Sequence, residues 1–275
     1  MLSIAKNKPL RGKRVAALAA DGFEYIELIV PRIALQAAGA TVEVVSLHRG
    51  KIRGMNLTEP TRTVRVNRTV GDADPWNYDA LFIPGGFIGP DFLRQSRAAR
   101  EFVRAFDHAD KPIASLCHGP WLLVSAELVE GRRLASWPGI RDDIVHAGGI
   151  WRDEPLVRDR NWVTSRGPQD LRAFVPAMRE LYAAGTVAAA ATRNGSAENA
   201  SSPQYDQPIS AAVMAARVLP GPTLRTALTA AAVAAAGAYA LRLANGSPKA
   251  LRANLRQLPL PKLGQWSRSA LPSWR

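Results

Sequence analysis

Short apolar runs alternate with segments of helical periodicity from residue 14 to about residue 184. The runs at residues 14–20, 80–83 and 112–116 are largely apolar. Two of them are bounded by Gly or Pro, which is typical of central parallel strands that are covered on both faces. The β-branched segment at residues 41–47 predicts a further strand.

Helical patterns lie between these strands. The first runs through residues 33–38 and ends at Gly39, with Pro31 near its predicted start, where a missing N–H is tolerated. Strand–helix alternation of this kind predicts an α/β fold, with a doubly wound, mostly parallel, flavodoxin-like sheet sandwiched by helices. Further helices are expected at about residues 97–109, 119–127, 140–147 and 169–184.

Composition divides the 275 residues into four parts. A basic tail (1–13) precedes the α/β domain (14–184), and a linker rich in Asn, Ser, Gly, Pro and Gln (185–208) follows it. The basic, Ala/Pro/Arg-rich C-terminal extension (209–275) is expected to be partly helical. Its Ala-rich stretch is too short and too weakly apolar to predict a membrane span, which needs about 20 strongly apolar residues.

The net charge of +13 is concentrated at the two ends of the chain. Residues 1–14 carry +5 and residues 186–275 carry +8, whereas residues 15–185 are neutral. Basic and aromatic residues are not interleaved, so no specific nucleic-acid recognition is expected. The tails are instead expected to be solubilising or weakly adhesive.

The single cysteine, Cys117, excludes an internal disulfide and fits a reducing compartment. The first eight residues contain no apolar core of signal-peptide length, so a cytoplasmic location is expected. His48, His108 and His146 are scattered without metal-ligand spacing, and no glycine loop with a lysine follows a strand. We therefore expect no metal and no cofactor.

Cys117 lies where the apolar run at residues 112–116 passes into a helical pattern. Ligands of open α/β sheets bind at the carboxyl ends of the strands, and a helix N-terminus favours a thiolate. This position therefore suits a nucleophile whose pKa lies below the usual value of about 8.5. A lone cysteine at a strand end is also often a small buried apolar residue.

The residues around Cys117 carry a more specific signal. The string CHGPWLL at 117–123, with PGG at 84–86 and DGFE at 21–24, strongly resembles the PfpI-type family. That family belongs to the class I glutamine amidotransferase-like superfamily and includes intracellular proteases, glyoxalases and deglycases. The resemblance covers about residues 13–184 and continues through residues 136–143, 147–149 and 161–166.

The resemblance implies a role for each matching residue. Cys117 would be the nucleophile and His118 its base or orienting partner. Glu24 would be the buried acid that hydrogen-bonds the cysteine sulfur, and its pKa would be raised. Alternatively, Glu24 is a carboxylate at the start of a helix, where it interacts with the helix dipole. Glu27 is expected on a helix surface or at an interface.

Two further parts of the site are implied by the same resemblance. Gly85 and Gly86 would turn the backbone so that N–H groups of Gly86 and His118 face an oxyanion. Independently of the resemblance, Trp121 and Trp137 are expected to line the cleft or to pack in the core. Asp91 matches an acid that contacts the histidine of a neighbouring subunit in protease-like members. Alternatively, Asp91 stabilises a turn or caps the N-terminus of a helix. A homo-oligomer, dimeric or larger, is therefore expected.

The function implied is that of a cysteine-dependent hydrolase. The substrate would be either a peptide, which makes the protein a peptidase, or a small aldehyde or its adduct on proteins, which makes it a glyoxalase or deglycase. A different hypothesis is a non-catalytic redox sensor or chaperone of the stress response. In that case Cys117 would oxidise to a sulfinate stabilised by Glu24.

Overall fold

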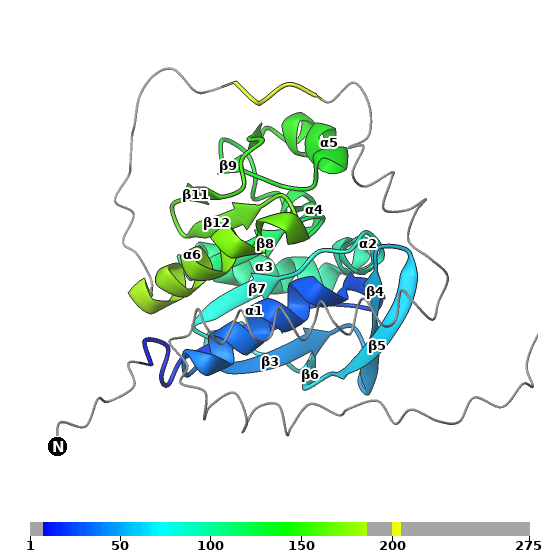
Figure 1. The fold of residues 1–275 in the computed structure, drawn as a ribbon, viewed down its shortest axis with the longest axis vertical. Helices are drawn as coiled ribbons and strands as arrows, with labels where there is room; N and C mark the ends of the chain where they lie inside the picture. The colour runs from blue at the N-terminus through cyan, green and yellow to red at the C-terminus, as the bar shows by residue number, and fades with distance from the viewer. Residues whose placement is uncertain (1–7, 186–199, 205–275) are drawn as a thin grey trace, which may run out of the picture.

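The computed structural model describes residues 8–185 and 200–204. Its centre is a seven-stranded sheet in the order β11-β12-β8-β7-β1-β3-β6 (Figure 1). Neighbouring strands are parallel except for β11 and β12, which are antiparallel. The predicted doubly wound, mostly parallel sheet is thus confirmed. The strands are β1 (Arg14–Leu18), β3 (Thr41–Ser46), β6 (Arg68–Thr69), β7 (Ala80–Ile83), β8 (Ile113–Leu116), β11 (Val157–Asp159) and β12 (Trp162–Ser165).

Helices cover both faces of this sheet, because alternate residues of each buried strand point to opposite sides. Val15 and Ala17 of β1 pack in the core beneath α1 (Tyr25–Ala37) and α6 (Leu171–Ala184). These two helices lie across the same face in Figure 1. The next residues along β1 pack in the second core, with α3 (Arg97–His108), α4 (Pro120–Ser125) and α5 (Arg141–His146).

The hydrophobic pattern did not predict several smaller elements. A three-stranded sheet joins β2 (Phe23–Glu24) to the hairpin of β4 (Lys51–Asn56) and β5 (Glu59–Arg65). The parallel pair of β9 (Arg133–Leu134) and β10 (Ile150–Trp151) lies beside α5. The remaining elements are the helix α2 (Ile88–Gln95) and the 3-10 turns η1 (Pro75–Asn77), η2 (Pro138–Ile140) and η3 (Pro168–Asp170).

The start of the first helix differs from the prediction. Helix α1 begins at Tyr25, so Pro31 lies inside the helix and not near its start. A proline inside a helix removes one backbone hydrogen bond. Leu28 and Val30 are buried in the core beneath this helix. Burial of such apolar side chains outweighs the loss of a single hydrogen bond.

The packed domain also extends past its predicted ends. Leu10, in the predicted tail, is fully buried, and its N–H donates to Ala38 O at 3.0 Å. Ser201 and Ser202, in the predicted linker, hydrogen-bond to Trp151. The expected helix in the C-terminal extension lies outside the described residues. Among residues 8–185 and 200–204, no helix has the length and apolar character that crossing a bilayer would require.

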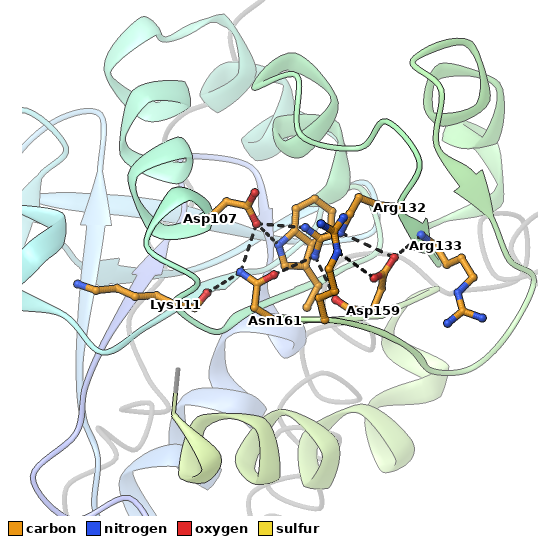
Figure 2. Close-up of polar contacts among 8 residues, drawn as sticks. Asp107, Lys111, Arg132, Arg133, Asp159 and Asn161 are labelled. Carbon is orange, nitrogen blue, oxygen red and sulfur yellow. Dashed lines mark hydrogen bonds and ion pairs between the residues drawn. The ribbon is translucent and has the colours of Figure 1, made fainter. Parts of the chain in front are cut away.

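A buried polar network joins α3 to residues next to β9, β11 and β12 (Figure 2). Arg132 is only 3% exposed and donates to Asp107 Oδ1 at 3.3 Å and to Asn161 Oδ1 at 3.0 Å. Asn161 Nδ2 donates in turn to Lys111 O at 3.0 Å. Asp159 accepts from the Arg133 N–H at 2.6 Å, so the network fixes the residues that enter β9.

Candidate active site

Cys117 occupies a strained turn at the carboxyl end of β8. Its φ of 58° is in the left-handed region, which non-glycine residues adopt rarely, and functional residues are common among the exceptions. The Cys117 N–H donates to Ser165 O at 3.1 Å, and its carbonyl accepts from the Trp137 N–H at 2.8 Å. These two bonds hold the turn. They direct the side chain to the edge of the sheet where open α/β proteins bind ligands.

His118 lies against the thiol. Its Nδ1 is 3.3 Å from the Cys117 sulfur, close enough for a hydrogen bond. Burial lowers the pKa of His118 to about 4, so the imidazole is neutral at physiological pH. A neutral imidazole next to a thiol can take up its proton.

The carboxyl group beside the sulfur belongs to Glu27. This residue is fully buried in the first turn of α1, accepts from the Gly85 N–H at 2.8 Å and lies beside Cys117 across Gly85. The expectation that Glu27 lies on a helix surface is therefore wrong. Glu24, expected at the sulfur, instead accepts from the Leu57 N–H at 2.9 Å and so holds the β4–β5 turn.

Burial also sets the protonation of the acids. Desolvation raises the pKa of Glu27 to about 8, with a further rise from the nearby charge of Glu24. Desolvation likewise raises the pKa of Glu24 to about 7, in the predicted direction. It raises the pKa of the Cys117 thiol well above its usual value, and the Glu27 charge adds to the effect. The prediction that the helix N-terminus lowers the pKa of the Cys117 thiol is therefore wrong. Helix α4 is only six residues long, and the loss of hydration outweighs its field.

The glycine pair after β7 allows this close packing. A Cβ on Gly85 would lie 2.4 Å from the Cys117 Cβ and 2.6 Å from Glu27 Oε2. Gly86 has a φ of 89°, and a Cβ there would lie 2.4 Å from the Glu24 backbone nitrogen. The Gly86 N–H lies near the Cys117 sulfur and opposes the rise in its pKa. The structure thus places Gly85 and Gly86 against the thiol.

Three aromatic rings enclose His118, and we call them the aromatic wall. Trp121, Trp137 and Phe87 have ring centroids 5.2, 5.9 and 6.3 Å from that of the imidazole. The Trp121 indole N–H donates to Asp143 Oδ2 at 3.1 Å, so α5 holds one side of the wall. Sequence reasoning considered both tryptophans as cleft residues but gave no role to Phe87.

Asp91 has a hydrogen-bond partner of its own in α2. It is in the first turn of α2, and its carboxylate accepts from Gln95 Nε2 at 3.0 Å. Within the described residues, Asp91 makes neither a hydrogen bond nor an ion pair to His118, and His118 Nε2 has no hydrogen bond. Phe87 and Phe92, on either side of Asp91 in sequence, are 43% and 46% exposed.

Comparisons with known proteins agree with this fold. Residues 13–181 match the DJ-1/PfpI family. The chain therefore belongs to the DJ-1/PfpI family. It is 43% identical over 168 residues to a deglycase of Pyrococcus abyssi, a match that covers 61% of this chain and 96% of that protein. Deglycase PfpI of Pyrococcus furiosus is 39% identical over the same shares of the two chains. The putative cysteine protease YraA of Bacillus subtilis is 38% identical over 59% of this chain and 94% of its own length.

Solved structures share the fold. A two-domain protein of Anabaena variabilis with DJ-1/ThiJ/PfpI-like and ferritin-like domains superposes with a TM-score of 0.58 at 32% identity. The match covers 61% of this chain and 47% of that protein. DJ-1 of Schizosaccharomyces pombe superposes with a TM-score of 0.55 at 22% identity, over 62% of this chain and 95% of its own.

Proposed function

We propose that this protein is a cysteine-dependent enzyme in which Cys117 attacks an electrophilic carbonyl carbon. The observation that supports this most directly is the left-handed turn at Cys117, with the sulfur 3.3 Å from His118 Nδ1. A strained backbone is maintained where function requires it, and a nucleophile within hydrogen-bond reach of a base is the signature of covalent catalysis.

In the proposed step the thiol proton passes to the neutral imidazole while the sulfur–carbon bond forms. The electron pair of the carbonyl moves onto its oxygen. The N–H groups of Gly86 and His118 would stabilise that oxyanion, because the Cys117 N–H is already bonded to Ser165 O. Protonated Glu27 would donate a hydrogen bond to the sulfur and keep a second negative charge out of the pocket.

A small carbonyl compound or its adduct on a protein is the substrate that we favour. Cys117 is only 6% exposed, and the aromatic wall narrows the approach to it. A small electrophile can enter such a site more readily than an extended polypeptide. The deglycase names of relatives that are 39–43% identical support the same class. Peptide hydrolysis is the second candidate, supported by the name of YraA.

The test compares wild type with Cys117→Ser on the methylglyoxal adduct of N-acetylarginine and on a fluorogenic peptide. We expect wild type to release free N-acetylarginine, and Cys117→Ser to be slower by at least on the order of 10³-fold. Peptide cleavage alone would assign the second candidate. If neither substrate is turned over but peroxide oxidises Cys117, the redox-sensor hypothesis would replace both.

We further propose that the site is completed by a second copy of the chain. His118 Nε2 has no hydrogen-bond partner within the described residues, whereas catalytic histidines are commonly oriented by an acceptor. Asp91 lies between Phe87 and Phe92 in sequence, and both rings are exposed, so a second copy would cover them. Asp91 of one protomer would then orient His118 of its partner.

A further inference from the structure

Strand β10 has one edge that its own sheet does not use. The N–H groups of Ile150 and Arg152 donate to carbonyls on the β9 side, Arg132 O at 2.8 Å and Leu134 O at 2.9 Å. Alternate residues of a strand point their N–H groups to opposite sides. The N–H groups of Trp151 and of Asp153, two residues further on, therefore face the outer edge.

Residues 200–204, which we call the strap, cover this outer edge. The Trp151 N–H donates to Ser201 Oγ at 3.0 Å, and the Asp153 N–H donates to Ser202 Oγ at 3.0 Å. The Ser202 N–H donates to Trp151 O at 2.8 Å. The hydroxyls of Ser201 and Ser202 thus accept from the two outward N–H groups. The main-chain bond from Ser202 to Trp151 fixes how the strap aligns with β10. This is strand addition at a sheet edge, with serine oxygens in place of carbonyls.

A side chain from another element holds the strap from the opposite side. Arg141, the first residue of α5, donates from Nε to Ser202 O at 2.8 Å. Its side chain is 17% exposed and also pairs with Asp142. Both the N–H and the C=O of Ser202 are therefore bonded to the domain. Ser202 is the residue on which the contacts converge.

We propose that the outer edge of β10, together with Arg141, is a docking site for the Ser201-Ser202 segment of the same chain. The strap closes an edge that would otherwise offer unpaired N–H and C=O groups to other chains. It also fixes the point beside α5 from which the C-terminal extension continues. The proposal does not depend on the reaction proposed for Cys117.

The docking site is connected to the aromatic wall through Trp151. This residue is fully buried, and its indole N–H donates to Ser136 Oγ at 2.9 Å. The Ser136 hydroxyl donates in turn to Trp137 O at 2.9 Å. Trp137 stacks on His118. The strap therefore bonds to the same buried residue that supports one side of the wall.

Amide hydrogen exchange of the full chain, resolved to single residues by NMR, tests the proposal. The variants are Ser201→Ala/Ser202→Ala and, as matched control, Gln204→Ala, because Gln204 is an exposed strap residue. We expect the Trp151 and Asp153 amides of the double variant to exchange at least roughly tenfold faster than in wild type. The Ile150 and Arg152 amides, which bond to the β9 side, should change much less, and Gln204→Ala should match wild type.

Two further measurements keep the proposal falsifiable. Arg141→Gln removes the bond to Ser202 O from the domain side, and it should speed exchange at Asp153 while both serines remain. Equal exchange of the Trp151 and Asp153 amides in wild type and in both variants would overturn the docking site. A wild-type protection that is lost on dilution would show that the strap comes from a second copy, and would overturn the assignment within one chain.

Discussion

Glu27, Cys117 and His118 make a site that is uncharged at rest. Burial raises the pKa of the carboxyl to about 8, raises that of the thiol, and lowers that of the imidazole to about 4. At neutral pH each group is therefore mainly in its neutral form. Charge develops only when the thiol proton moves, so the hydrogen bond from Glu27 and the backbone N–H groups act at that moment.

The first prediction concerns thiol reactivity in Glu27→Gln. Beyond desolvation, the charge of ionised Glu27 raises the Cys117 pKa, and an uncharged amide removes that charge. We expect the pH of half-maximal alkylation by iodoacetamide to be lower in Glu27→Gln than in wild type. Glu24→Gln is the matched control, because that carboxyl lies three residues away and bonds to Leu57. Its shift should be smaller, and a half-point in Glu27→Gln at or above that of wild type would contradict the assignment.

The second prediction concerns stability as a function of pH. The pKa of Glu27 is raised from 4.5 to about 8 on folding. The unfolded chain therefore loses this proton at lower pH than the native chain, and native stability falls as pH rises from 4.5 to 8. His118 has the opposite sign, since its pKa is lowered from 6.5 to about 4, so stability falls as pH drops through that interval. Urea unfolding at pH 5–9 should show a weaker alkaline loss in Glu27→Gln than in wild type, and identical profiles would count against the raised pKa.

The motif around Cys117 predicted which residues gather at the site, but not which acid touches the sulfur. The prediction of Glu24 came from the resemblance of the DGFE motif at residues 21–24 to the PfpI-type family. Once α1 starts at Tyr25, Glu27 is in its first turn and faces inward, and Glu24 precedes the helix. The charged side chain gave no hydrophobic signal of its own burial. Only the position of the helix start could have distinguished the two carboxyls.

Among the elements, the central strands were predictable because their apolar runs are continuous, whereas α2 and the β4–β5 hairpin were not. Gly89 and Pro90 suggest a turn, yet they occupy the first turn of α2, where a missing N–H costs nothing. In the hairpin only Ile52, Gly54 and Val64 are buried, so the alternation is too sparse to indicate strands. These elements depend on tertiary contacts, because Glu24 and β2 hold the hairpin.

The third prediction tests the network that joins α3 to β9 and β12. Asp107 accepts from Arg132, from Asn161 and from the Trp162 indole N–H at 2.7 Å, while the guanidinium lies 3.7 Å from the Trp162 ring. Asp107→Ala leaves the buried Arg132 without its main charge partner. We expect the free energy of unfolding, measured by urea denaturation, to fall by about 3–5 kcal/mol.

A double variant and a surface control show whether the loss of stability comes from the unpaired Arg132 charge. Asp107→Ala/Arg132→Met should recover part of the loss, because the stranded cation is gone. Arg49→Ala removes an exposed pair with Asp72 and should cost less than about 1 kcal/mol. A loss in Asp107→Ala no larger than that of Arg49→Ala would show that the network is not a structural support.

For the whole molecule, the boundaries of the domain predicted from composition differ from those that the contacts define. Leu10 packs in the core from within a basic segment, and Ser201 and Ser202 dock from within a polar one. A single buried leucine or a pair of serine hydroxyls leaves no periodic pattern. The family match ends at residue 181, so the strap, in the segment predicted as a linker, lies outside the matched region.

The last prediction concerns assembly. If Asp91 orients the partner's imidazole, then Asp91→Ala and Cys117→Ser should each be inactive alone, since every site lacks one of the two groups. After subunit exchange in a 1:1 mixture, a site works only when Cys117 comes from the first variant and Asp91 from the second. In any closed homo-oligomer this holds for about a quarter of the sites, so activity should return to about 25% of wild type. Mixing Asp91→Ala with Asp91→Ala/Cys117→Ser is the control, because no combination of these chains restores Asp91. Full activity of Asp91→Ala alone, or activity of an isolated monomer, would remove Asp91 from the mechanism and leave Cys117, His118 and Glu27 to act within one chain.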